Sequence, residues 1–257
     1  MMEMASQAQF SANTGFLWRE LPFTDRIRAA AAAGFDAVEF HDEAQGSDLT
    51  QIRDILAETG LPVCGLNVRM GATAGCAALP GHEDQARRDV DEALRVAEAL
   101  GAGAVHVLAG RTSADADRAA YTRVLRHALD AGDRTILIEP ISRAAIPDYF
   151  LHDISEAAAL IDEISHARLK ILFDCFHIAM EGGEIQAAFD QHAARIGHVQ
   201  IASVPDRHEP GTEDDLDPAS VIGHMQRAGY QGPFGCEYHP RSSVEAGLSW
   251  RAGLRNR

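Results

Sequence analysis

The chain has 257 residues, of which 46% are apolar and 24% charged, and its formal net charge is −15. A chain of this length buries enough surface to fold without disulfides or a structural metal, so any metal that it binds is expected to be functional. The excess of acidic residues argues against nucleic acid and anionic membranes as partners, because most of the surface would repel phosphate groups.

The segment before the first expected strand, residues 1–9, lacks the basic and apolar stretches of a signal peptide, and we expect it to be a flexible extension. No later run approaches the ~18 consecutive apolar residues of a membrane span. The four cysteines form no C-x-x-C pair, which fits apolar packing in a reducing compartment. These features together predict a cytoplasmic protein.

Short runs of β-branched and apolar residues recur along the whole chain and predict eight strands. The strands are expected at residues 9–13, 36–40, 62–67, 104–108, 135–139, 169–174, 198–202 and 234–238. Ala-rich segments with helical spacing separate them, for example residues 24–33, 48–58 and 83–100. Glycines that suit helix ends follow these three segments, at Gly34, Gly60 and Gly101.

This alternation predicts a single (β/α)8 TIM barrel over residues 1–257, with eight parallel strands and outer helices. No Pro- or Ser-rich linker divides the chain, which supports one domain. A doubly wound open sheet is the structural alternative, but eight units of about 30 residues favour closure into a barrel.

Polar side chains stand at the ends of the last four expected strands, where a TIM barrel carries its reactive groups. They are Glu139, Asp174, Gln200 and Glu237. Neighbouring strands are ~4.8 Å apart, so the four side chains could converge on one point. Three carboxylates that close need a cation, and an all-oxygen set suits Mg²⁺ or Mn²⁺ better than Zn²⁺. For any single one of them the alternative is a solvated acid or a helix N-cap.

Several motifs follow one another in an order that is typical of a known family. The most specific are Phe10-Ser11-Ala12-Asn13, Gly34-Phe35, Val38-Glu39-Phe40, Leu79-Pro80-Gly81, Ile138-Glu139-Pro140-Ile141, Asp174-Cys175-Phe176-His177, Gly197-His198-Val199-Gln200-Ile201-Ala202, Glu209-Pro210-Gly211-Thr212 and Gly235-Cys236-Glu237-Tyr238. Through these motifs the chain resembles the hydroxypyruvate isomerases of the xylose isomerase-like TIM-barrel superfamily, which also includes ketose 3-epimerases and inosose dehydratases.

The resemblance implies one divalent metal ion, Mg²⁺ or Mn²⁺, bound by the four residues at the strand ends. It also implies that Glu139 and Glu237 transfer protons. The epimerases have a histidine at the position of Gln200, so the glutamine points to the hydroxypyruvate isomerase branch.

Further residues match substrate-contacting positions of the superfamily, namely His177 and Arg207. His198 shares a strand face with Gln200, so we expect it to point into the barrel and support the site without binding the metal.

Three segments depart from the family pattern. Residues 41–46 replace an aromatic and proline-rich turn, the loop 69–76 lacks a Gly-Glu-Arg-Gly segment, and His239 stands in place of a lysine. Because these loops shape the pocket, the substrate stays open within the superfamily.

The implied reaction interconverts hydroxypyruvate and tartronate semialdehyde through an enediolate that the metal stabilises, with one of the two glutamates taking the proton. Candidates to hold the substrate carboxylate are Arg207, Arg69 and His177. The expected partner is therefore a small-molecule substrate, a hydroxy-carbonyl acid or sugar. Assembly into a homo-oligomer is compatible with the sequence.

Other functions remain as alternatives. A ketose 3-epimerase or an inosose-type dehydratase would use the same metal. A DNA-repair nuclease of this fold would need a His-rich zinc cluster and a basic face, which the net charge of −15 disfavours. A non-catalytic ligand-binding barrel is the remaining alternative, since this fold hosts many functions.

Overall fold

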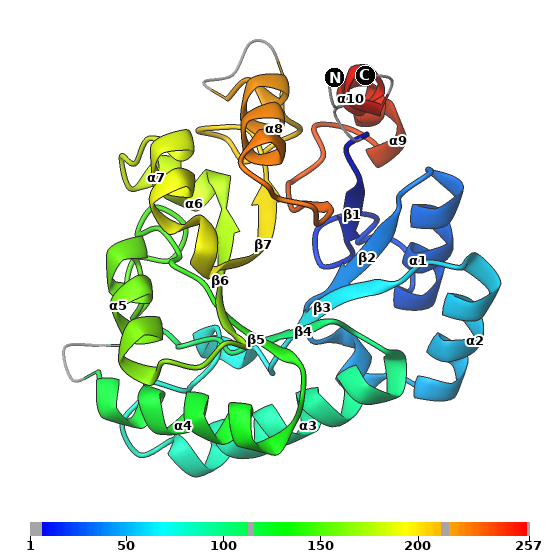
Figure 1. Ribbon diagram of the computed structural model, residues 1–257. Coiled ribbons are helices and arrows are strands. Elements are labelled where there is room, and N and C mark those ends of the chain that lie inside the picture. Colours follow the sequence, from blue (N-terminus) through cyan, green and yellow to red (C-terminus); the bar gives the residue numbers. More distant parts are fainter. Residues whose placement is uncertain (1–6, 113–115, 212–215, 256–257) are drawn as a thin grey trace.

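The computed structural model describes residues 7–112, 116–211 and 216–255. Within these residues eight parallel strands form a closed barrel, in which each strand pairs with the next and β8 returns to β1 (Figure 1). The strands are β1 (Phe10–Asn13), β2 (Ala37–Phe40), β3 (Val63–Asn67), β4 (Ala104–His106), β5 (Thr135–Ile138), β6 (Leu169–Asp174), β7 (Ile196–Ile201) and β8 (Phe234–Cys236). The predicted TIM barrel is confirmed, and each strand overlaps its predicted range.

Helices cover the outside of the barrel, and every strand is followed by at least one of them (Figure 1). The α-helices are α1 (Phe23–Ala32), α2 (Leu49–Thr59), α3 (Glu83–Leu100), α4 (Arg118–Ala131), α5 (Ile154–Ile164), α6 (Cys175–Met180), α7 (Ile185–His192), α8 (Pro218–Arg227), α9 (Val244–Gly247) and α10 (Ala252–Arg255). Short 3-10 helices are η1 (Glu43–Gly46), η2 (Gly71–Thr73), η3 (Ala193–Arg195) and η4 (Leu248–Arg251). Among the described residues, no helix has the length and apolar character that a membrane crossing requires.

Local sequence sets the ends of many helices. Five of them begin at an aspartate whose carboxylate accepts hydrogen bonds from the first turn, which satisfies N–H groups that lack a partner within the helix. These N-caps are Asp48, Asp117, Asp153, Asp174 and Asp217. Gly34, Gly60 and Gly101 follow α1, α2 and α3 with φ of 70°, 72° and 69°, as their positions in the sequence predicted.

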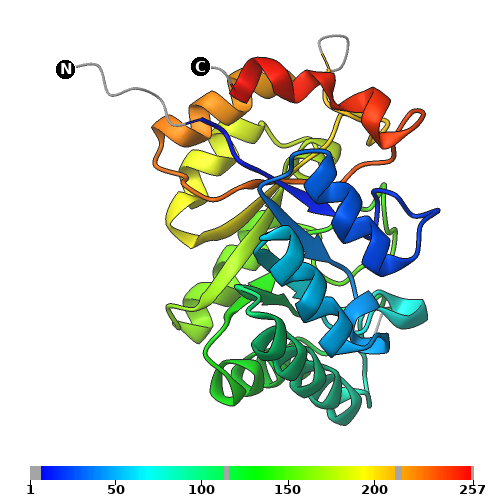
Figure 2. The same ribbon diagram turned by 90° about the vertical axis from the view of Figure 1, so that its right-hand side faces the viewer.

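The C-terminal helices close the ring of helices beside β1 (Figures 1 and 2). The Trp250 ring meets the Phe10 ring edge to face, with centroids 5.2 Å apart. The buried Arg251 guanidinium lies 3.8 Å from the centroid of the Phe35 ring, at the end of α1. Aromatic and cation–π contacts therefore join the two ends of the described chain.

The segment predicted as a flexible extension, residues 1–9, is described only in part. Ala8 is buried, and the carbonyl of Gln9 accepts a hydrogen bond from the Phe234 N–H at 2.9 Å. Residues 1–6 lie outside the described residues, as does Thr212 of the motif at 209–212.

A polar pair lies inside the barrel below its carboxyl end. His198 Nε2 is 2.6 Å from Glu39 Oε2, and both residues are buried, so His198 points inward as predicted. Gly235 of β8 leaves room for this pair, because a Cβ there would lie 2.4 Å from Glu39 Oε1 and 2.8 Å from Gln200 Cγ. The barrel interior is thus packed tightly under the strand ends.

We expect Gly235→Ala to lower the free energy of unfolding by about 1–3 kcal/mol, because the added methyl group overpacks the barrel interior. Gly253→Ala in α10 is the matched control, since a Cβ there meets no atom within 4 Å, and its effect should stay within about 0.5 kcal/mol. Urea unfolding followed by circular dichroism measures both values. Equal stability of the two variants would contradict this account of the interior.

Candidate active site

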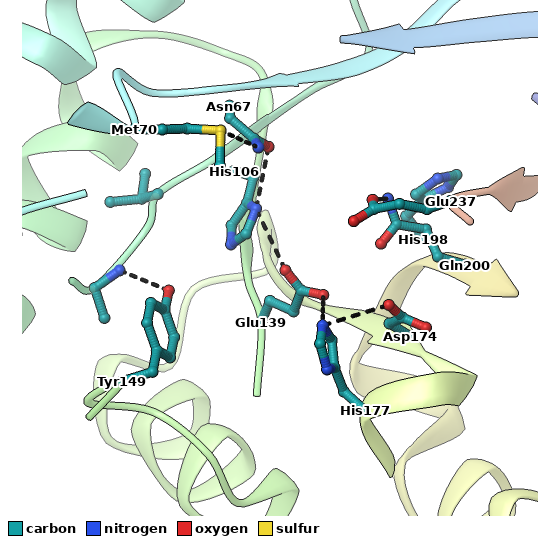
Figure 3. A network of polar contacts seen from close by, with 12 residues as sticks. Asn67, Met70, His106, Glu139, Tyr149, Asp174, His177, His198, Gln200 and Glu237 are labelled. Atoms are coloured by element: carbon teal, nitrogen blue, oxygen red, sulfur yellow. Dashed lines mark hydrogen bonds and ion pairs between the residues drawn. The ribbon is translucent and has the colours of Figure 1, made fainter. Parts of the chain in front are cut away.

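The four residues predicted to bind a metal meet at the carboxyl end of the barrel (Figure 3). Asp174 ends β6 and pairs in register with Gln200 of β7, which in turn pairs with Gly235, two residues before Glu237. Glu139 follows directly after β5. The register of neighbouring parallel strands therefore brings these side chains to one place.

Two buried oxygen atoms in this group have no hydrogen-bond partner. Glu237 Oε2 accepts from Asn13 Nδ2 at 2.7 Å and from Gln200 Nε2 at 2.5 Å, which leaves Gln200 Oε1 without a donor. Glu139 Oε1 is also buried and accepts no hydrogen bond. Buried acceptors are normally satisfied, so these two oxygens fit a site that receives a positively charged or hydrogen-bonding group.

A partly buried arginine bridges two of the carboxylates. Arg207 Nη2 donates to Asp174 Oδ2 at 2.9 Å and to Glu237 Oε1 at 2.8 Å. Its guanidinium lies between the rings of Phe16 and Phe176, 4.8 and 4.9 Å from their centroids. The backbone of Arg207 has φ of 55°, a conformation that is rare for residues with a side chain. This loop thus holds a cation inside the site.

Burial dominates the protonation of the carboxylates. It raises the pKa of Asp174 to about 6 and that of Glu237 to about 7, while Arg207 acts in the opposite direction. The pKa of Glu139 is raised well above its ordinary value by burial and by the charges of Glu237 and Asp174. A cation among them would favour the ionised forms.

His177 lies beside two of the carboxylates. Its Nε2 is 3.5 Å from Asp174 Oδ2 and 3.7 Å from Glu139 Oε1, and the candidate ligand atoms of these three residues lie within 4.8 Å of one another. The Ser142 N–H donates to His177 Nδ1 at 3.3 Å, so Nε2 carries the ring proton. His177 in this tautomer offers a hydrogen-bond donor to the site, which agrees better with a substrate contact than with metal ligation.

A cavity of about 170 Å³ opens onto these groups. Its polar lining includes Glu139, His177, Gln200, Arg207 and Glu237, and its apolar lining includes Met70, Ala74, Leu108, Ile141 and Ile146. Arg207 is the only lysine or arginine in its described lining. The cavity therefore suits a small ligand that carries a negative charge at one end.

The model of a family described as xylose isomerase-like TIM barrel matches residues 27–255. The chain belongs to this family. It is 39% identical to the 2-oxo-tetronate isomerase of Cupriavidus necator, over 94% of this chain and 96% of that protein. It is 36% identical to the hydroxypyruvate isomerase of Escherichia coli, over 94% of this chain and 97% of that protein. The predicted resemblance is therefore confirmed.

A crystal structure titled AP endonuclease, family 2, from Brucella melitensis is also similar to this xylose isomerase-like barrel. It has a TM-score of 0.90 and 33% sequence identity, over 97% of this chain and all of that one.

One sequence expectation for this xylose isomerase-like barrel is wrong. Arg69, a candidate to hold a substrate carboxylate, turns outward and forms two hydrogen bonds with Glu92 of α3, at 2.7 and 2.8 Å.

Two of the segments that depart from the family pattern contribute residues next to the site. His41 lines the cavity with its ring 5.5 Å from that of Phe16, and His239 lies 4.8 Å from the same ring.

Three residues of the site were not predicted from the sequence. They are Asn13, Asn67 and His106, at the ends of β1, β3 and β4. Asn13 and Asn67 end their predicted strands, so the rule that found the four residues on β5 to β8 would have found them too. His106 ends β4, whereas the sequence predicted that this strand extends to residue 108. Burial lowers the pKa of His106 to about 3, so its ring is neutral near pH 7.

Proposed function

We propose that this protein is a metal-dependent isomerase that interconverts hydroxypyruvate and tartronate semialdehyde, or a closely related small 2-oxo acid or sugar, through an enediolate. The observation that carries the proposal is the group of three carboxylates, those of Glu139 and Asp174 buried and that of Glu237 partly buried, which Arg207 bridges in part. Beside them lie buried oxygens of Glu139 and Gln200 that accept no hydrogen bond. The names of the two isomerases to which the chain is similar support the same chemistry.

The donor set fits a hard divalent ion, Mg²⁺ or Mn²⁺, because it offers only oxygen atoms. The residues that would hold it are Glu139, Asp174, Gln200 and Glu237. The unpaired oxygens of Glu139 and Gln200 are free to act as ligands, whereas the proton on His177 Nε2 keeps that ring out of the set. When bound, the ion supplies a Lewis acid that stabilises negative charge on the substrate oxygens.

The proposed proton transfers involve the two glutamates. One of Glu139 and Glu237 removes a proton from carbon 3 of hydroxypyruvate, and a proton returns to carbon 2 while the hydroxyl proton passes between the two oxygens. Substrate and product are isomers, so no oxidant or reductant takes part. The apolar wall of the cavity limits the access of water to the enediolate.

The remaining groups would orient the substrate. Arg207, as the cation of the cavity, would bind the substrate carboxylate through paired N–H groups. His177 would donate its Nε2 proton to a substrate oxygen near Asp174.

Solvent exchange tests the proposal before the product is known. The protein is incubated in D₂O with Mg²⁺ or Mn²⁺ and a panel of hydroxypyruvate, 2-oxo-tetronate and small ketoses, and deuterium incorporation is followed by NMR. We expect exchange that depends on the metal together with formation of an isomer. Metal binding without exchange in any panel member would overturn the proposal.

The same panel separates the alternatives. A ketose 3-epimerase would exchange a proton of a ketose and invert its carbon 3, whereas a dehydratase would release water. A nuclease would act on none of these compounds, and the net charge of −15 disfavours a nucleic acid partner.

The affinity for Mn²⁺ should rise at least about tenfold between about pH 5 and about pH 8, because protons compete with the ion for carboxylates whose pKa is raised. The pKa values of Asp174 and Glu237, about 6 and about 7, place both groups largely in the protonated form at the lower pH. Calorimetric titrations in buffers of different ionisation enthalpy would measure both the affinity and the protons released. An affinity that is constant over this range would contradict the assignment of these two ligands.

A further inference from the structure

His106 is a buried polar residue of the cavity that the proposed proton transfers do not use. It ends β4 and is 3% exposed. In a closed ring of eight strands β4 lies opposite β8, so His106 and Glu237 line the same cavity from opposite sides. His106 therefore bounds the cavity across from the carboxylates that Arg207 bridges.

Neighbouring side chains determine which ring nitrogen of His106 carries the proton. Nδ1 lies 3.1 Å from Asn67 Oδ1 and 3.7 Å from Glu139 Oε2 (Figure 3). Asn67 Nδ2 faces Met70 Sδ at 3.7 Å, and a thioether can only accept, so the amide oxygen must be the atom that faces His106. Two acceptors thus surround Nδ1, and the network assigns the proton to it.

The other ring nitrogen, Nε2, is then a hydrogen-bond acceptor. It is buried and has no partner. In Figure 3 it points away from Glu139, Asp174 and Glu237. The lining of the cavity also includes apolar residues such as Met70 and Leu108, which cannot donate to it. A buried acceptor without a donor is unfavourable, so a ligand that brings a hydroxyl group there gains affinity.

We propose that His106 is a specificity-determining residue that accepts a hydrogen bond from a substrate hydroxyl beyond the two reacting carbons. The site then selects 2-oxo acids with a hydroxyl on carbon 4 over hydroxypyruvate, which ends at carbon 3. This inference rests on the proposed function, in which Arg207 holds the carboxylate and the reacting carbons lie beside Glu139 and Glu237. The hydroxyl on carbon 4 then lies at the end of the cavity opposite Arg207.

A cycle of two proteins and two substrates isolates this hydrogen bond. The kcat/KM values of the wild type and His106→Leu are measured with 2-oxo-tetronate and with its 4-deoxy analogue, 2-oxo-3-hydroxybutanoate. The wild type should prefer the hydroxylated substrate at least about tenfold, and His106→Leu should lose that preference. A general structural defect would lower both values by the same factor and leave their ratio unchanged.

Two further variants define the outcome. His106→Gln can present an amide oxygen near the position of Nε2 and should restore part of the preference. Asn67→Leu removes the acceptor that holds the proton on His106 Nδ1, and it should therefore weaken the preference. Thermal unfolding checks that each variant is folded. An equal preference in the wild type and His106→Leu would overturn the inference and leave the isomerase proposal standing. Absence of turnover of every 2-oxo acid by the wild type would overturn both.

Discussion

Glu237→Gln is expected to abolish the incorporation of solvent deuterium into the substrate, with a fall in kcat of about 10³-fold or more. The substitution removes both a proton-transfer group and a carboxylate ligand, and each contributes several kcal/mol to catalysis of this type. The shape of the side chain and its contacts with Asn13 and Gln200 can be retained, because an amide still offers an oxygen to the same donors. NMR measurement of exchange in D₂O with saturating Mn²⁺ provides the test.

The matched control is Glu181→Gln. Glu181 follows α6 at the same end of the barrel, accepts a hydrogen bond from the Arg143 guanidinium at 3.0 Å, and is not part of the described cavity lining. Its replacement should leave exchange within about twofold of the wild type. Retention of exchange in both Glu237→Gln and Glu139→Gln would refute the proton transfers proposed for these residues.

Arg207→Met should lower kcat/KM for a 2-oxo acid by about 10²- to 10³-fold, mainly through KM, because the described cavity lining has no other lysine or arginine to pair with the carboxylate. Arg207→Lys should recover only part of this loss, since an ammonium group cannot form the paired hydrogen bonds of a guanidinium. The Phe16 and Phe176 rings, which enclose the guanidinium, favour the planar cation as well. Steady-state kinetics over a range of substrate concentrations separates KM from kcat.

The control for this substitution is Arg143→Met, which removes an exposed arginine that pairs with Glu181 outside the cavity. Its kcat/KM should match that of the wild type. If Arg207→Met retained full kcat/KM for 2-oxo acids, Arg207 would serve only as a counter-charge for Asp174 and Glu237. The variant would then differ from the wild type in thermal stability alone.

The fold was predictable because its signals are local and repeated. Apolar runs of strand length alternate with helical spacing, and glycines such as Gly60 and Gly101 stand where the backbone needs positive φ. The convergence of the polar residues on β5 to β8 was predictable as well. Parallel strands in a barrel keep a regular register, so their last residues must come together at one end.

The sequence by itself therefore determined the barrel, the family resemblance and the four oxygen-bearing side chains at its carboxyl end. Only the tertiary structure decided the roles of loop and rim residues, since these depend on partners far away in the chain. Arg207 and Arg69 stand in comparable loops, yet one enters the site between two aromatic rings and the other pairs with Glu92 on the surface. The proton position on His106 likewise follows from Asn67, on another strand. Strand ends are placed by a repeating backbone pattern, whereas the direction of a loop side chain is set by long-range contacts that no local pattern encodes.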